Sequence, residues 1–166
     1  FDLIESAANT FTTERIDLQL NALDNEVFVV TGVKMDLDIC DANNASGNVR
    51  SKTFATLSKQ DISNSNVKSL GNPSVFASAT IQSSSDVSPQ PGGDNFGVAY
   101  VVIENSTDAP EQVEYLDIIA TPDFYVNLQG TSNVNAKTMA GKMYGYRARA
   151  DASTYAALVQ SELLSQ

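Results

Sequence analysis

The side chains best suited to chemistry are few in this chain of 166 residues, which contains no histidine and a single cysteine, Cys40. Without imidazole there is no Ser–His–Asp or Cys–His catalysis, no histidine acid–base work and no histidine-based zinc site. One thiol cannot form an intrachain disulfide or a thiolate metal cluster. We therefore expect Cys40 to be a small residue on a strand, and the protein not to be an enzyme.

Paired carboxylates are the remaining route to catalysis. Two acids on either side of a glycosidic bond can hydrolyse it, and Asp36/Asp38 and Glu114/Asp117 are pairs of this kind. A chain with 20 acidic residues contains such pairs by chance, however, and tryptophan, which often lines sugar-binding clefts, is absent. We therefore give hydrolysis little weight and interpret these acids as solvated residues.

Oxygen-rich segments raise the question of a metal. The stretch "DLDICDANN" gathers five oxygen-bearing side chains in nine residues. Ca²⁺ binds six to eight oxygen atoms, so Asp36, Asp38 and Asp41 are the candidates for a calcium site, although the glycine of an EF-hand loop is missing. A solvated strand end is the simpler interpretation, as it is for Asp94 and Asn95. No other metal or cofactor is expected.

Three short patterns are interpreted as loops. Ser65 to Lys68 match the four-residue Ser-x-x-Lys pattern, but the companion motifs of that catalytic class are missing. Asn44 and Asn105 each begin an Asn-x-Ser/Thr acceptor pattern, which is typical of surface loops.

The elements that must position these residues are strands. Alternation of apolar and polar residues predicts about eight of them. They cover residues 15–20, 27–40, 49–57, 74–84, 96–105, 112–120, 123–130 and 138–150. Strands at this spacing, separated by turns, predict an all-β protein: an antiparallel β-sandwich that is jelly-roll-like. One domain is expected over residues 1–166, with 1–11 as an N-terminal extension.

Details of the strands follow from the same alternation. Val33, Met35, Leu37 and Ile39 are expected on one face, with Cys40 on the other, and Gly32 marks a bulge or bend. In the strand at 123–130, we expect Phe124, Val126 and Leu128 to face inward, with Tyr125, Asn127 and Gln129 outward. The segment 96–105 is the most continuously apolar and is expected to be a strand that is buried on both faces or central to a sheet.

The period changes near the C-terminus, where a short amphipathic helix is predicted over 151–164. Its apolar stripe comprises Ala152, Tyr155, Ala156, Val159 and Leu163, with Leu158 and Glu162 beside it. Asp151 or Ser153 can cap the first turn. Such a helix must dock, either on its own domain or on a neighbouring subunit. The assembly interpretation predicts that removing the residues after Ala150 weakens assembly more than folding.

Composition limits the partners. The net charge of −10 and a pI near 4.2 argue against direct nucleic-acid binding, which needs clustered Lys and Arg. No stretch approaches the roughly 20 apolar residues of a transmembrane segment. Charged residues are only 18%, so the surface is rich in Ser, Thr, Asn and Gln, as in many secreted, cell-surface and virion proteins.

From Thr12 to Ala150 the strand pattern and composition resemble viral jelly-roll coat (capsid) proteins. The resemblance implies a structural subunit located in the virion, which self-assembles and contacts other coat proteins through edge strands, loops and the C-terminal helix. Because there is no basic arm, it implies a virion with an internal membrane, or a decoration protein on a preformed shell.

Candidate residues for packing between subunits lie on the last strand and the helix. They are Tyr144, Tyr146, Tyr155, Leu158 and Leu163. The alternatives are a secreted or cell-surface β-sandwich that binds carbohydrate, or a subunit of a surface layer or filament. The discriminating feature is whether the apolar strand edges are covered by the domain itself or by a neighbouring subunit.

Overall fold

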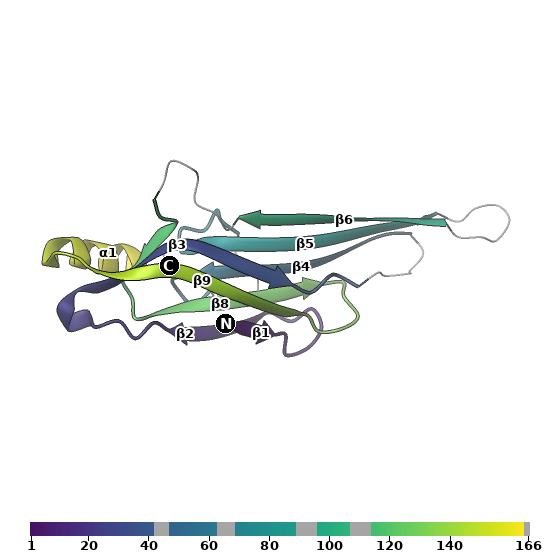
Figure 1. Ribbon diagram of the computed structural model, residues 1–166. Helices are drawn as coiled ribbons and strands as arrows, with labels where there is room; N and C mark the ends of the chain where they lie inside the picture. The colour runs from purple at the N-terminus through teal and green to yellow at the C-terminus, as the bar shows by residue number, and fades with distance from the viewer. Residues whose placement is uncertain (42–46, 63–68, 89–95, 107–113, 165–166) are drawn as a thin grey trace.

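Two antiparallel β-sheets packed face to face form the protein (Figure 1). The structure, a computed structural model, describes residues 1–41, 47–62, 69–88, 96–106 and 114–164. Sheet A contains β1 (Asp2–Ile4), β9 (Thr138–Arg149), β3 (Glu26–Leu37) and β7 (Asp117–Ile119), in that order. Sheet B contains β2 (Thr12–Asp17), β8 (Asp123–Thr131), β4 (Gly47–Ser58), β5 (Val75–Ser88) and β6 (Phe96–Ser106). A 3-10 helix (Ala22–Asp24) precedes β3, and α1 (Ala152–Leu164) follows β9.

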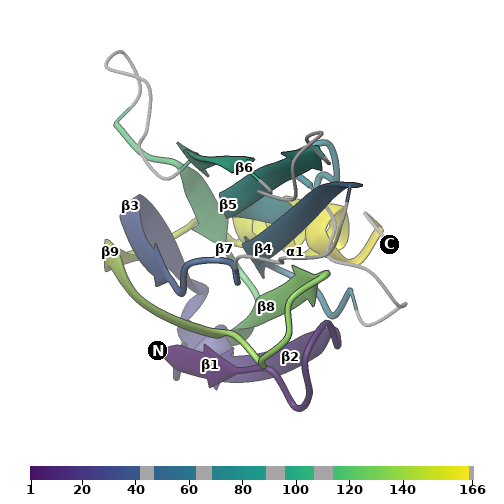
Figure 2. The same cartoon turned by 90° about the vertical axis from the view of Figure 1, so that its right-hand side faces the viewer.

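The order of the strands is that of a jelly roll. Apart from β6, the strands form two facing sets, β1-β9-β3-β7 and β2-β8-β4-β5, in which the first strands pair with the last ones. Strand β6 adds a fifth strand to sheet B beyond β5. Figure 2 shows the two layers in end view, curving away from β1 and β2. The predicted all-β sandwich with a short C-terminal helix is confirmed.

The core lies between the sheets and is built by alternation. Phe124, Val126 and Leu128 of β8 are buried as predicted and belong to one core cluster with Leu57 of the adjacent strand β4 and Val30 of the opposite sheet. The strand β3 contributes further inward side chains until it ends at Leu37. At that point the prediction was wrong: Ile39 is 68% exposed and Cys40 is buried. The chain leaves the strand there, because the Asp38 carboxylate binds the backbone N–H and hydroxyl of Thr138.

The predicted N-terminal extension is part of the sandwich, which corrects the boundary at residue 11. Residues Asp2–Ile4 pair with Ala140, Met139 and Thr138 of β9, and Leu3 is buried. The Phe1 ring meets the Phe124 ring edge to face at 6.1 Å between centroids. A three-residue strand of this kind is specified by its partner 140 residues later, not by a local pattern.

Two further predictions are wrong about position. Strand β6, expected to be buried on both faces or central to a sheet, is the edge of sheet B, and its Ile103 is exposed. Asn127 lies on the outward side of β8, but it is fully buried. Its side-chain amide donates to the Ser58 hydroxyl at 3.0 Å, and its oxygen accepts from the Thr13 hydroxyl at 2.9 Å. Asn127 therefore joins three strands by polar contacts instead of facing solvent.

The helix α1 begins where predicted. The Asp151 carboxylate caps it by accepting the backbone N–H groups of Ser153 and Thr154, each at 3.0 Å. Hydrogen bonds from the Ser153 and Thr154 hydroxyls, followed by these backbone bonds, hold the pKa of Asp151 well below its usual range. The helix lies at the end of the sandwich that is on the left in Figure 1. No helix in the described part of the chain is long and apolar enough to cross a membrane.

Candidate functional site

The predicted packing residues are in two different environments. Tyr155 and Leu158 are half-buried and pack, with Val159, against Val27 and Val29 of β3. These contacts attach α1 to its own domain. The helix therefore caps its own domain, and the prediction that its removal weakens assembly more than folding stays a prediction.

The docked face of α1 is rotated relative to the predicted stripe. Glu162, noted in the sequence only as a neighbour of that stripe, is 3% exposed. Its carboxylate accepts the backbone N–H groups of Ala120 at 2.9 Å and Thr121 at 3.0 Å, at the end of β7. Leu163, by contrast, is exposed. No local pattern could identify Glu162 as an anchor, since the groups it binds are backbone amides some 40 residues earlier.

An outward groove of about 530 Å³ runs along α1 beside the docked face. Its lining comprises Tyr155, Ala156, Val159, Gln160, Leu163 and Leu164. Leu163 and Leu164 are 58% and 74% exposed, so the described part of the domain leaves this apolar end of the groove uncovered.

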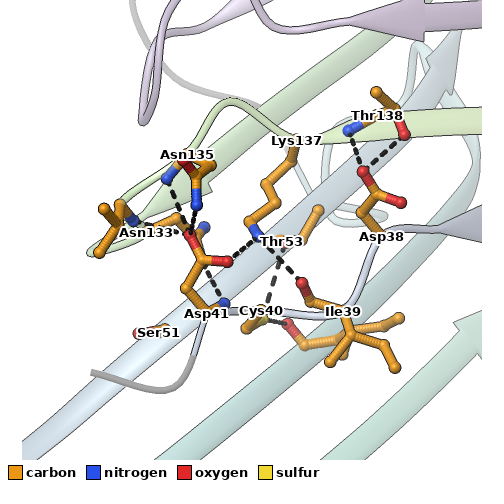
Figure 3. Close-up of polar contacts among 12 residues, drawn as sticks. Asp38, Ile39, Cys40, Asp41, Ser51, Thr53, Asn133, Asn135, Lys137 and Thr138 are labelled. Carbon is orange, nitrogen blue, oxygen red and sulfur yellow. Dashed lines mark hydrogen bonds and ion pairs between the residues drawn. The ribbon is translucent and has the colours of Figure 1, made fainter. Parts of the chain in front are cut away.

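Of the three acids of the proposed calcium site, Asp38 and Asp41 bind different groups of the protein (Figure 3), and Asp36 lies exposed on β3. Asp41 binds the ammonium of Lys137 at 2.6 Å and accepts the backbone N–H groups of Val134 and Asn135, each at 2.8 Å. Asp38 is occupied by Thr138. Among the described residues, no group of three or more His, Cys, Asp or Glu side chains is arranged to hold a metal ion. Asp41 thus holds the loop between β8 and β9, and Asp38 binds Thr138, the first residue of β9.

Lys137 is the centre of this polar cluster. Its side chain is only 5% exposed, and its ammonium also donates to the Ile39 carbonyl at 3.0 Å. The hydrogen bond from Lys137, followed by those from the backbone, lowers the pKa of Asp41 below its ordinary value. A buried ammonium requires such partners, because desolvation of an unpaired charge is costly.

A second buried carboxylate closes the same end of the sandwich. Glu5 accepts the backbone N–H of Lys137 at 2.8 Å and also that of Gly130. The side chain of Asn133 joins the cluster to β4 by donating to the Lys52 carbonyl at 2.9 Å. Each of these contacts satisfies a buried or half-buried polar group.

Other predicted residues have simple environments or are not described. Cys40 is buried, and its thiol donates to the Ile81 carbonyl at 3.0 Å, but it lies after the end of β3 and not on a strand as predicted. The Ser65–Lys68 pattern, Asn44, Asp94 and Asn95 lie outside the described residues, and of Asn105 only the backbone, in β6, is described. Tyr144 and Tyr146 are exposed on the outward side of sheet A, two residues apart on β9.

The fold and these contacts define an all-β jelly-roll sandwich with a docked C-terminal helix. Comparisons with protein-family models, with curated proteins and with solved structures find no match for this chain.

Proposed function

We propose that this protein is a non-enzymatic structural subunit of a virion shell, a coat or decoration protein that associates with copies of itself and with other coat proteins. The observation that carries the proposal is the open edge of sheet B. Strand β6, which is 11 residues long, forms this edge, and no strand in the described part of the chain pairs with its outer side.

The sequence of β6 makes this edge suited to pairing. An exposed edge offers unpaired N–H and C=O groups, and soluble monomers usually protect it with lysine, proline or a very short strand. The segment "FGVAYVVIENS" contains no Lys, Arg or Pro, and Glu104 is its single charge. Ile103, which is described in full, is 63% exposed. The edge therefore has the features of a surface for strand addition.

A second copy of the chain is a suitable partner for this edge. Two β6 strands side by side in parallel would place Glu104 against Glu104, and like charges directly opposite each other are destabilising. An antiparallel pair keeps the two carboxylates apart and joins the two sheets into one. We propose the outward groove of α1, with Leu163 and Leu164, as a further contact surface in the shell.

The jelly roll itself supports the proposal by analogy. This architecture occurs in viral capsid proteins and also in lectins, so it is compatible with both the shell and the carbohydrate interpretation. The open edge favours the shell.

The test is the mass of the native protein by size-exclusion chromatography with light scattering, with negative-stain electron microscopy of the same fractions. We expect dimers or larger closed particles. Ile103→Lys should reduce assembly, because a lysine at this edge opposes pairing. Leu23→Lys is the matched control, since Leu23 is also an exposed apolar residue and lies on the 3-10 helix. A monomer at all protein and salt concentrations would contradict self-assembly.

A further inference from the structure

The outward face of sheet A carries a second surface that shell formation does not explain. Residues directly opposite each other on β3 and β9 share a face, so the register aligns Lys34 with Lys142 and Gly32 with Tyr144. A hollow of about 400 Å³ lies beside Lys34, Lys142 and Tyr144. Its lining comprises Phe1, Lys34, Asp36, Ala140, Gly141, Lys142 and Tyr144. We call this lining the sheet A hollow.

Gly32 lies opposite Tyr144, one of the residues that line the hollow. The pairing of β3 with β9 shifts register between Val30 and Gly32, which is the bulge predicted from the sequence. A Cβ atom added at Gly32 would meet no atom within 4 Å. The partner of Tyr144 therefore has no side chain that could cover the tyrosine, and Tyr144 is 53% exposed.

A second aromatic ring extends this surface. Tyr146, which is 57% exposed, is the next outward residue of β9 and lies about 7 Å along the strand. A pyranose ring has a face of C–H groups that stacks on an aromatic ring, while its hydroxyls need hydrogen-bond donors and acceptors. The two tyrosines offer such rings, and Lys34, Lys142 and Asp36 offer both donors and an acceptor beside them.

The two lysines specify a charge on the ligand. Like charges directly opposite each other on a sheet are destabilising, yet Lys34 and Lys142 are aligned in this way. Neither forms an ion pair with any residue that the structure describes, although the chain has twice as many acidic as basic residues. A carboxylate bound between them would relieve their repulsion.

We propose that the sheet A hollow binds a glycan that carries a carboxylate, such as a chain of hexuronic acid units. One sugar stacks on Tyr144 above Gly32, its carboxylate binds Lys34 and Lys142, and Asp36 accepts from a hydroxyl. The next sugar reaches Tyr146. A polynucleotide, which also combines stacking rings with anions, fits less well, because a phosphodiester has no hydroxyl to donate to Asp36 and two lysines provide few of the phosphate contacts on which such a ligand depends.

The proposal is tested by isothermal titration calorimetry of the full chain with a tetramer of galacturonic acid. A neutral cellotetraose and a short oligodeoxynucleotide serve as the comparison ligands. We expect binding of the uronate alone, weakening as salt is added. Lys142→Gln should weaken it about tenfold, the value of one charge-assisted hydrogen bond.

Two variants distinguish binding at the sheet A hollow from non-specific attraction of the ligand to positive charge. Gly32→Thr fills the space beside the Tyr144 ring, so binding should be lost while the melting temperature is kept, since threonine favours strands. Lys52→Gln removes one positive charge from sheet B, where the ammonium lies 4.3 Å from the Phe54 ring centroid, and should leave binding unchanged. The proposal is overturned if the uronate does not bind at about 10 mM, or if cellotetraose binds equally well. It is also overturned if the oligodeoxynucleotide binds more tightly, or if Lys52→Gln weakens binding as much as Lys142→Gln.

Discussion

The carboxylate of Glu162 is expected to hold α1 on the sandwich, and Glu162→Ala tests this directly. The side chain is almost fully buried and accepts two backbone N–H groups, at Ala120 and Thr121. A hydrogen bond to a charged group contributes about 1.5–3 kcal/mol. Ala120 is 1% exposed, so its N–H would lose its partner without gaining water, whereas Thr121 is only partly buried. We therefore expect Glu162→Ala to lower the free energy of unfolding by about 2–4 kcal/mol.

Urea unfolding followed by far-ultraviolet circular dichroism measures this change, since the chain has no tryptophan for fluorescence. Glu162→Gln keeps one acceptor but places an amide donor against the second N–H, so about half of the loss is expected. Gln160→Ala, at an exposed position of the same helix, should change stability by less than about 0.5 kcal/mol. If Glu162→Ala is no more destabilising than Gln160→Ala, the carboxylate does not anchor the helix and the reasoning fails.

Four other contacts of the sandwich lead to predictions of their own. Deletion of residues 151–166 should lower the thermal midpoint, because it uncovers Val27 and Val29; an unchanged midpoint would show that the helix is a free tail. Lys137→Met should cost about 2–4 kcal/mol in urea unfolding, because the Asp41 carboxylate and Ile39 carbonyl lose their donor; a neutral effect would contradict the cluster. The folded-state pKa of Asp41 is below its ordinary value of 3.8. The stability that Asp41 contributes is therefore present above pH 3.8 and is lost as the pH falls through the folded-state pKa. In an acid titration, the unfolding free energy of Asp41→Asn should depend less on pH than that of the native protein. Gly145→Ala should destabilise by about 1–3 kcal/mol, because its Cβ would overlap the Val29 carbonyl oxygen and the Phe28 ring, whereas Gly32→Ala meets open space and should be tolerated.

The alternation of apolar and polar residues was enough to predict the strands in which one face is buried and the other is exposed. Val33, Met35 and Leu37 are buried as expected, and so are Phe124, Val126 and Leu128. These positions depend only on which side of the strand faces the other sheet. The bulge at Gly32 also followed from the residue itself.

The sequence-based predictions were wrong where the conformation of a segment depends on a partner that is distant in the sequence. Strand β1 is only three residues long and exists because β9 pairs with it. The Asp38–Thr138 contact ends β3 and reverses the positions of Ile39 and Cys40. An apolar run such as β6 indicates a strand, but not whether that strand is at the edge or in the middle of a sheet.

In the candidate sites, too, some features follow from residue type alone and others depend on distant partners. The lack of histidine and of a second cysteine excludes histidine and thiolate-cluster chemistry by residue type alone. The choice between a calcium ligand and an ion-pair partner for Asp41 required the position of Lys137, which is 96 residues away in the sequence. That Tyr144 lies opposite a residue without a side chain depends on its register with Gly32.

The pairing of the first strands with the last ones has a consequence for how the chain is made. During synthesis, β4, β5 and β6 can form antiparallel neighbours as soon as they emerge, because they are consecutive. Strands β1 and β2 must wait for β9 and β8, so most of the chain has to leave the ribosome before either sheet is complete. Pairings this distant in sequence are slow to form. We therefore expect the apolar edge of β6 to be exposed on a partly folded chain before the sandwich closes. In that interval, aggregation with other copies of the chain through this edge is most probable.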